Sequence, residues 1–282
     1  MMRNAMPLVD CHFHLFDAGA GTPSARYRPA YAARIEDWQQ LLAPMGDPYG
    51  VVVQTSFLGT DNSVLLEALH ARSDRLRGVA VVDPSVSDEA LADMHAAGVR
   101  GIRLNLFDDP DWARIGTAPW RALFARVAAL GWHVELHTAN GQGGAMLAEL
   151  DAALGDCRAP VVLDHFGRPG EDGLRDGVFA VTAQVLARRQ VWVKLSASYR
   201  LPPGTDWRSL ASAWGGTVGH DRLLLGSDWP WTNHESAVRA RECAVLFDWP
   251  GGQGVGGYGM ENALFAEGLR WRNAAALYGF EL

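Results

Sequence analysis

The sequence predicts an α/β protein, a (β/α)₈ TIM barrel that forms a single domain over residues 1–282. The chain has 282 residues, close to the roughly 250 that are typical of this fold. Eight short β-rich runs alternate with helical patterns, which is typical of a parallel sheet, and eight such units favour closure into a barrel. Polar residues also gather at the ends of the β-rich runs, where active sites of this architecture lie.

The expected strands are short apolar runs, namely Leu8–His14, Gly50–Phe57, Arg77–Asp83, Val99–Phe107, Trp132–Thr138, Pro160–Phe166, Val191–Ala197 and Arg222–Trp229. The stretches between them contain helical patterns at Ser63–Ser73, Asp88–Ala97, Trp120–Leu130, Gly144–Leu154, Val178–Arg189 and Trp207–Val218. No low-complexity stretch divides this repeat, so we expect one domain.

Two connections depart from the repeat. The first, Asp17–Asp37, is long and follows the first strand, so we expect it to lie over the barrel mouth as a lid. The second, Trp249–Gly259, contains a formal GxGxxG match at Gly252–Gly257. No strand precedes this match within a βαβ unit, so we interpret the segment as a flexible loop and not as a dinucleotide site.

Composition limits the class of protein. With 48% hydrophobic and 20% charged residues, the chain is typical of a globular protein. The net charge of −7 argues against nucleic acid or an anionic membrane as a partner. The absence of a signal-like or membrane-spanning run, together with three widely separated cysteines, favours a cytoplasmic location. The oligomeric state stays open, and a homo-oligomer is one option.

The first strand carries the pair His12 and His14. Residues two apart on a strand point to the same face, so these imidazoles project together, with Val9, Cys11 and Phe13 on the other face. The simpler alternative is two packing histidines at a strand end. Partners elsewhere in the chain favour a functional interpretation.

Those partners stand at the ends of other strands: Arg103, Asn105, His137, His165, Arg168, Arg200 and Asp228. His12, His14, His137 and Asp228 have the ligand types of a mononuclear Zn²⁺ site. Such an ion lowers the pKa of bound water to ~7 and polarises a carbonyl group. The sequence therefore predicts one divalent metal, with zinc as the first choice.

Other polar residues have structural interpretations. We expect His133 and Glu135 to be polar groups of the barrel interior, Asp10 to make an internal hydrogen bond, and Asp164 to cap the following helix. Arg103, Arg168 and Arg200 are either ion-pair partners or the binding groups of an anionic ligand. Because all three arginines converge on the mouth of the barrel, the sequence favours the second interpretation, an anionic ligand.

Four motifs carry a resemblance to a known family: VDCHFHL at Val9, LDHFGRP at Leu163, KLSASYR at Lys194 and LLGSDWPWTNHE at Leu224. Together they resemble amidohydrolase family 2 of the amidohydrolase superfamily, in the group of 2-pyrone-4,6-dicarboxylate lactonases and sugar-lactone hydrolases. The resemblance implies that Asp228 is the general base and that His12, His14 and His165 polarise the lactone carbonyl. It further implies that Arg103, Arg168 and Arg200 hold substrate carboxylates.

The chain departs from that group in two ways. The pyrone-dicarboxylate enzymes work without a metal and lack a histidine at the end of the fifth strand, whereas His137 here completes a metal set. Their additional arginine after the fourth strand is replaced by the acidic stretch Phe107–Pro110. No lysine lies on the inward face of the fourth strand, so a binuclear centre on a carboxylated lysine is not expected, and Lys194 is expected to be structural.

The leading hypothesis is a hydrolase that opens a small anionic lactone, carboxylated or derived from a sugar. A metal-dependent decarboxylase is the second, because the wider family contains such enzymes with the same ligand types. A non-catalytic binding barrel is the third, and the intact set of histidines with Asp228 speaks against it.

Overall fold

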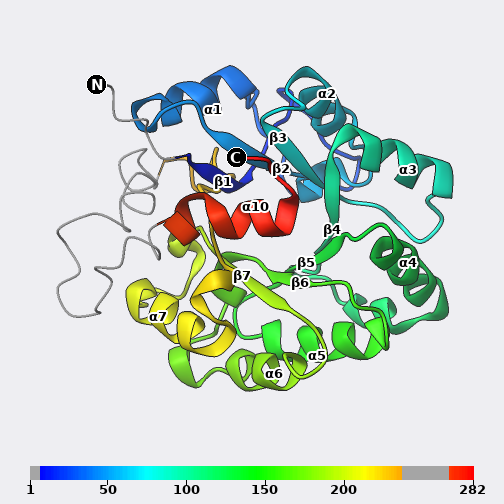
Figure 1. Cartoon of the computed structure of the whole chain (residues 1–282), viewed down its shortest axis with the longest axis vertical. Coiled ribbons are helices and arrows are strands. Elements are labelled where there is room, and N and C mark those ends of the chain that lie inside the picture. The colour runs from blue at the N-terminus through cyan, green and yellow to red at the C-terminus, as the bar shows by residue number, and fades with distance from the viewer. Residues whose placement is uncertain (1–6, 237–266) are drawn as a thin grey trace.

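The structure is a computed structural model that describes residues 7–236 and 267–282. Its centre is an eight-stranded sheet in which sequence neighbours pair in parallel, in the order β1 to β8 (Figure 1). The strands are β1 (Val9–Phe13), β2 (Tyr49–Val53), β3 (Leu76–Ala80), β4 (Val99–Asn105), β5 (His133–His137), β6 (Val161–Leu163), β7 (Val191–Leu195) and β8 (Leu223–Leu225).

The two edge strands meet and complete the ring. A parallel bridge joins Phe13 to Trp229. The backbone amides of His14 and Asp228 donate to the carbonyls of Trp229 and His12, at 2.9 and 2.8 Å. The predicted (β/α)₈ barrel is therefore confirmed.

Helices surround the ring and cover its outer, apolar face: α1 (Ile35–Leu42), α2 (Ser63–Ala71), α3 (Asp88–Ala97), α4 (Ala118–Ala129), α5 (Gly143–Leu154), α6 (Gly177–Val185) and α7 (Trp207–Val218). A further helix, α10 (Asn273–Tyr278), does not belong to this outer layer. Local sequence sets their ends. The Ser87 side chain accepts a hydrogen bond from the amide of Ala90 and caps α3, and Gly98 ends this helix in the left-handed conformation.

The helix α10 lies across one end of the barrel (Figure 1). Its Tyr278 is fully buried and packs with inward side chains of the strands, including Val51 and Val162. The ring of Tyr278 also meets the His133 ring edge-on, with centroids 5.3 Å apart. This end is therefore closed, and the barrel opens at the opposite end, where the strands finish.

Several predicted strands are longer than the observed ones. The expected strands Pro160–Phe166 and Arg222–Trp229 shorten to three residues each, in β6 and β8. The residues that follow adopt positive φ angles, with φ 51° at His165 and φ 54° at Asp228, so the chain leaves the sheet early. Composition gives no signal for such turns, because these residues are not glycine.

The strand β1 carries an irregularity that the alternation of residues did not predict. Its register against β2 shifts between Asp10 and Phe13. As a result, Cys11 joins the inner apolar cluster and Asp10 faces the helix α1, where it accepts a hydrogen bond from the Trp38 indole at 2.8 Å. The prediction that Val9 and Cys11 lie on the face opposite to His12 and His14 is wrong, because both join the inner cluster and the bulge reverses the alternation before His12; for Phe13, which stacks on Trp38, the prediction is confirmed. The internal hydrogen bonding predicted for Asp10 is confirmed.

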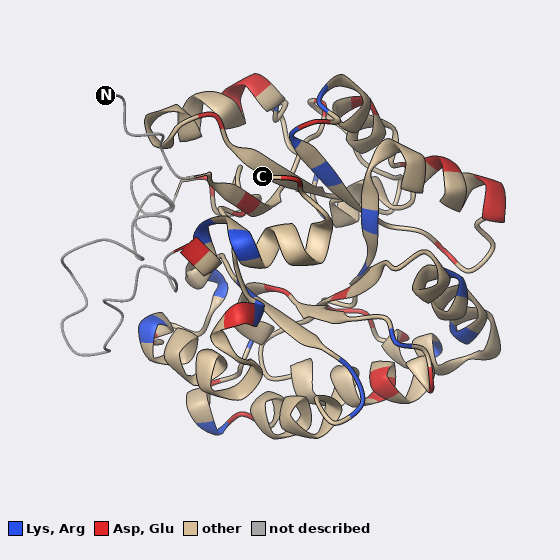
Figure 2. Cartoon of the chain, viewed as in Figure 1, with Lys and Arg blue, Asp and Glu red and all other residues tan. Residues whose placement is uncertain are grey.

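Acidic and basic side chains are distributed over the outer helices (Figure 2). Among the described helices, none has both the length and the apolar character needed to cross a membrane. The segment Trp249–Gly259, interpreted above as a flexible loop, lies outside the described residues.

Candidate active site

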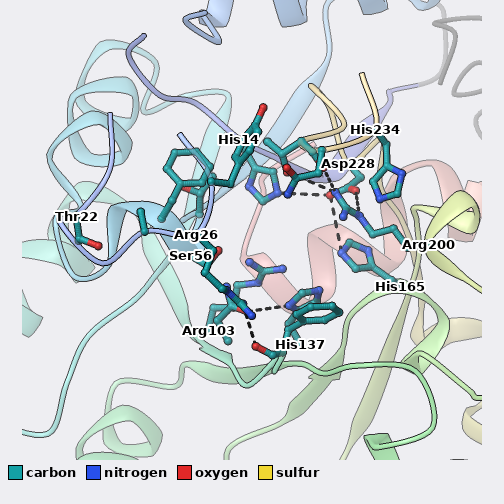
Figure 3. A pocket seen from close by; sticks show the side chains of 18 of the residues that line it. His14, Thr22, Arg26, Ser56, Arg103, His137, His165, Arg200, Asp228 and His234 are labelled. Carbon is teal, nitrogen blue, oxygen red and sulfur yellow. Dashed lines mark hydrogen bonds and ion pairs between the residues drawn. The ribbon is translucent and has the colours of Figure 1, made fainter. Parts of the chain in front are cut away.

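A cavity of about 450 Å³ opens at the ends of the strands (Figure 3). Its walls come from residues at the ends of seven of the eight strands or just after them, and from the connection between β1 and α1. That connection lies over the mouth, as predicted. The Tyr27 and Tyr31 hydroxyls donate to Glu235 after β8, and Arg26 donates to Asp108 after β4 at 3.1 Å.

Asp228 is the central polar residue of the cavity. Three imidazole Nε2 atoms face its Oδ1, those of His12 at 3.4 Å, His14 at 3.4 Å and His165 at 3.8 Å. Its Oδ2 accepts hydrogen bonds from the Tyr199 hydroxyl at 2.5 Å and from Arg200 Nε at 2.8 Å. One oxygen is therefore held in place, whereas Oδ1 lies buried without a hydrogen-bond partner among the described residues.

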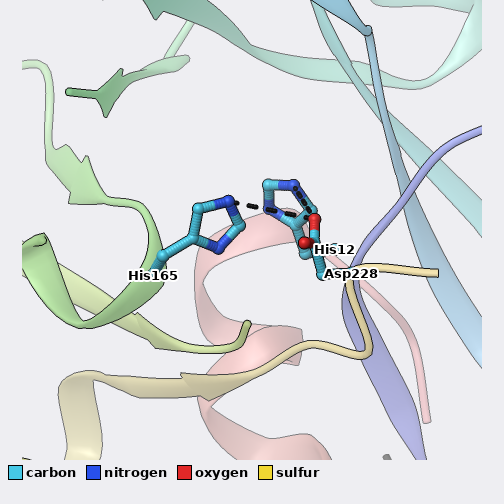
Figure 4. A group of neighbouring side chains, drawn as sticks. All are labelled: His12, His165 and Asp228. Atoms are coloured by element: carbon cyan, nitrogen blue, oxygen red, sulfur yellow. Dashed lines mark ion pairs between the residues drawn. The ribbon is translucent and has the colours of Figure 1, made fainter. Parts of the chain in front are cut away.

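The backbone turns after β6 and β8 direct His165 and Asp228 toward each other (Figure 4). Both residues adopt the left-handed conformation, which costs free energy for residues other than glycine and often marks functional sites. Close packing of β8 against β1 also requires Gly226, because a Cβ atom there would lie 2.6 Å from His12 Cβ. Gly226 of the GSD sequence thus allows the close approach of the two strands that carry His12 and Asp228.

Hydrogen bonds at the opposite ring nitrogen orient the imidazoles. His14 Nδ1 lies 2.7 Å from the carbonyl oxygen of Val53, so this nitrogen carries a hydrogen and donates it to that oxygen. His165 Nδ1 lies 2.8 Å from the Ser196 hydroxyl. His12 Nδ1 lies 3.2 Å from Lys194 Nζ and 3.3 Å from Asp164 Oδ1.

The site combines an ionised carboxylate with neutral imidazoles. Burial alone would raise the pKa of Asp228, but Arg200 and the neighbouring imidazoles outweigh it and hold this pKa well below its usual value. Burial lowers the pKa of His165 to about 3, only partly opposed by Asp228 and Asp164. Burial and the Lys194 ammonium also lower the pKa of His12. At neutral pH the carboxylate is therefore charged and these rings are not.

A charged layer supports the imidazoles from inside the barrel. Lys194 Nζ lies 2.5 Å from Glu135 Oε2, and both side chains are fully buried. His133 and Glu135 were expected to be hydrogen-bonded groups of the barrel interior: both are buried, but the two ring nitrogens of His133 and Oε1 of Glu135 lack hydrogen-bond partners among the described residues. His12, Glu135 and Asp164 also bring ligand-type atoms within 4.8 Å of one another, but the Lys194 ammonium already supplies the positive charge there.

The prediction that Asp164 caps a helix is wrong. Asp164 makes no side-chain capping bond, and its Oδ2 accepts from Arg103 Nε and Nη2 at 2.9 and 2.8 Å. Asp164 directly follows β6 and points to the same inward face as Val162. Because His165 has a positive φ angle, Asp164 and His165 both face the barrel interior although they are adjacent in the chain. Counting the alternation from Val162 would have found this orientation.

The other predicted residues, unlike the fully buried His12 behind the wall, line the cavity, with different surroundings. Arg200 pairs with Asp228, and Arg103 with Asp164. Arg168 lies over the Phe107 ring, 5.4 Å from its centroid. Asn105 Oδ1 lies 2.9 Å from His137 Nδ1, and the His137 ring stands edge-on to His165.

Three residues at the site were not assigned a role from the sequence. Ser196 and Tyr199 stand at the end of β7 in the KLSASYR motif, and their contacts with His165 and Asp228 depend on the turn at Ala197, which has φ 51°. Arg26 belongs to the connection over the mouth, and no periodicity indicates which of its side chains turns inward.

The buried neutral histidines make stability depend on pH. Unfolded His165 titrates at its ordinary pKa near 6.5, whereas the folded protein keeps this ring neutral until about pH 3. The unfolded state therefore binds the proton first, and His165 costs stability as pH falls below 6.5. Between about pH 6.5 and pH 5, we expect the free energy of unfolding of His165→Gln to fall by about 2 kcal/mol less than that of the wild type. Urea unfolding at both pH values measures this, and exposed His70→Gln serves as the control. An identical pH dependence in His165→Gln and wild type would contradict it.

A parallel (β/α)₈ barrel with a carboxylate and several imidazoles at the ends of its strands is typical of a class of hydrolytic enzymes. The chain matches the family described as amidohydrolase over residues 9–280, and it belongs to that family.

Three relatives indicate the range of chemistry. The chain is 32% identical to a 2-pyrone-4,6-dicarboxylate hydrolase of Comamonas testosteroni, over 80% of this chain and 77% of that protein. It is 28% identical to a 4-sulfomuconolactone hydrolase of Rhizobium radiobacter, over 78% of this chain and 75% of that protein. A solved structure named a probable 2-pyrone-4,6-dicarboxylic acid hydrolase, from Acinetobacter baumannii with citric acid bound, superposes with a TM-score of 0.84 at 29% identity. That match covers 98% of this chain and all of the other.

Proposed function

We propose that the protein hydrolyses the ester bond of a small anionic lactone in the cavity. One observation carries the proposal: Asp228 Oδ1 is buried, lacks a hydrogen-bond partner among the described residues, and faces three imidazole nitrogens. A water molecule and a lactone carbonyl placed there would satisfy both the carboxylate and the imidazoles. The names of the relatives above, which are lactone hydrolases, support the same reaction.

In the proposed mechanism, Asp228 Oδ1 accepts a proton from water as the water oxygen bonds to the carbonyl carbon. When no metal is bound, the imidazoles of His12 and His165 donate hydrogen bonds to the carbonyl oxygen, where negative charge develops. The bond between this carbon and the ring oxygen then breaks, and the proton held by Asp228 passes to the ring oxygen. The product is the ring-opened acid, and Asp228 returns to its ionised form.

A low pKa makes Asp228 a weak base in general terms. The fixed orientation of the Asp228 carboxylate compensates in part for this low basicity, because Tyr199 and Arg200 hold one oxygen and leave the other directed into the cavity. Polarisation of the carbonyl by the imidazoles makes its carbon more reactive toward a poorly activated water.

The donor set also fits a divalent metal. Ligand atoms of His12, His165 and Asp228 lie within 4.8 Å of one another, and His12 Nε2 and Asp228 Oδ1 lack hydrogen-bond partners among the described residues. His14 adds a third imidazole, with its Nε2 3.4 Å from Asp228 Oδ1. We propose Zn²⁺ as the ion, held by His12, His14, Asp228 and one further imidazole. When bound, it would polarise the carbonyl and lower the pKa of water.

The further imidazole is either His165 or His137. The sequence favoured His137, whereas the compact group in the structure contains His165. We therefore expect His165→Ala to lose bound zinc and His137→Ala to retain it, with each protein purified without chelator and examined by elemental analysis. Zinc loss in His137→Ala alone would restore the set chosen from the sequence. Metal-free wild type with activity unchanged by chelation would contradict a metal role altogether.

The reaction is tested on a panel of carboxylated and sugar-derived lactones. We expect release of one proton per turnover, measured at constant pH, and a product that has gained one water. Release of carbon dioxide would instead indicate the decarboxylase alternative. Absence of turnover with binding retained would favour the non-catalytic barrel.

A further inference from the structure

Lys194 is the only lysine among the 25 lysine and arginine residues of the sequence. It lies on β7, and its side chain is fully buried inside the barrel. Lys194 has no part in the mechanism proposed above. A lysine differs from an arginine in offering a compact ammonium whose three N–H bonds point in separate directions. The groups that these bonds meet therefore indicate its role.

Three groups surround the Lys194 ammonium: Glu135 Oε2 at 2.5 Å, His12 Nδ1 at 3.2 Å and Asp164 Oδ1 at 3.8 Å. All of these side chains are buried, so water does not compete for the contacts. The Glu135 carboxylate balances the charge of the lysine, and an ammonium donates hydrogen bonds but cannot accept them. The contact with His12 therefore has a fixed direction, in which Lys194 donates and Nδ1 accepts.

This direction decides where the His12 ring carries its hydrogen. An accepting Nδ1 has a lone pair, so the hydrogen of the ring lies on Nε2. Nε2 faces Asp228 Oδ1 at 3.4 Å, on the side of the reaction (Figure 4). Asp164 Oδ1 lies 3.3 Å from Nδ1, but it has no hydrogen-bond partner among the described residues. It is placed to accept from Nδ1 only in the opposite tautomer.

We propose that Lys194 is a positioning residue that keeps the hydrogen of His12 on Nε2. Its effect on the rate rests on the proposed lactone hydrolysis, because Nε2 must donate to the carbonyl oxygen when no metal is bound. The side chain of Lys194 does not belong to the lining of the cavity, so it acts through His12. An interior charge that served stability alone would not select a tautomer.

The same contact sets a preference between the metal-free and the zinc-bound site. A ligating ring nitrogen must present a lone pair, and its other ring nitrogen usually donates to a carboxylate. Zinc at Nε2 of His12 therefore requires the hydrogen on Nδ1, where Asp164 Oδ1 is the acceptor. Lys194 opposes this arrangement and weakens zinc binding, whereas Asp164 supports it.

The tautomer of the wild-type protein can be measured without any turnover. Ring nitrogens with and without a hydrogen have well-separated ¹⁵N chemical shifts, so we examine the full-length protein with ¹⁵N-labelled histidine after removal of metal by a chelator. The His12 signals are assigned by their loss in His12→Gln. We expect the hydrogen on Nε2 at neutral pH. A hydrogen on Nδ1 would overturn the proposal.

A pair of variants separates positioning from stability. The double variant Lys194→Met with Glu135→Gln removes the donor together with the carboxylate that it would leave without a partner. We expect its His12 hydrogen on Nδ1 and its metal-free kcat about 10²–10³-fold below that of Glu135→Gln alone. In calorimetric titrations it should bind zinc about 10–100-fold more tightly than Glu135→Gln.

Glu135→Gln alone is the matched control, because it keeps Lys194 and should keep the hydrogen of His12 on Nε2. Thermal unfolding establishes that each variant is folded at the temperature of the measurement. A hydrogen on Nε2 in the double variant, or equal zinc affinity in the two variants, would overturn the proposal. Failure of the whole lactone panel, with the predicted change of tautomer, would refute the hydrolysis and not the positioning of His12.

Discussion

Asp228→Asn should abolish most turnover while the barrel stays folded. The amide keeps the size of the side chain and the contacts at one oxygen, but it cannot accept a proton from water. We expect kcat to fall by about 10²–10⁴-fold, the usual contribution of a positioned general base. Initial rates on the best lactone of the panel measure the loss, and circular dichroism with thermal unfolding establishes the fold.

Affinity for the best lactone of the panel provides the control for this variant, because it reports whether the cavity remains intact. A retained affinity with lost turnover assigns the defect to chemistry. A rate within about threefold of wild type, a barrier change of only ~0.7 kcal/mol, would remove Asp228 from the role of base.

The barrel could be predicted because its signals are local. Each strand is a short apolar run, each helix has its own pattern, and the alternation of side chains placed Arg103, Asn105 and His137 inward. The same rule failed at β1, where a bulge between Asp10 and Phe13 turns Cys11 inward. A register shift depends on pairing with β2 and leaves no mark in the sequence of β1 alone.

The charge pairing of the site could not be predicted, because it depends on which side chains meet across the barrel. Arg103 on β4 pairs with Asp164 after β6, strands that are not neighbours in the sheet. Arginines that look equivalent at strand ends therefore differ in availability. Positive φ angles at His165 and Asp228 are likewise visible only in the structure. They decide which imidazoles face the carboxylate.

Arg103→Met should destabilise the fold strongly. The guanidinium of Arg103 contacts Asp164 Oδ2 through two nitrogens and lies 3.5 Å from Glu135 Oε1, with all three side chains buried. Removing it leaves a buried carboxylate without its main partner. We expect a loss of about 3–5 kcal/mol in the free energy of unfolding, measured by urea denaturation.

Replacing the partner as well should recover much of that loss. In the double variant Arg103→Met with Asp164→Asn, the stranded negative charge is absent, so we expect higher stability than in Arg103→Met alone. Stability of Arg103→Met equal to that of the wild type would show that the pairing of Arg103 with Asp164 is dispensable.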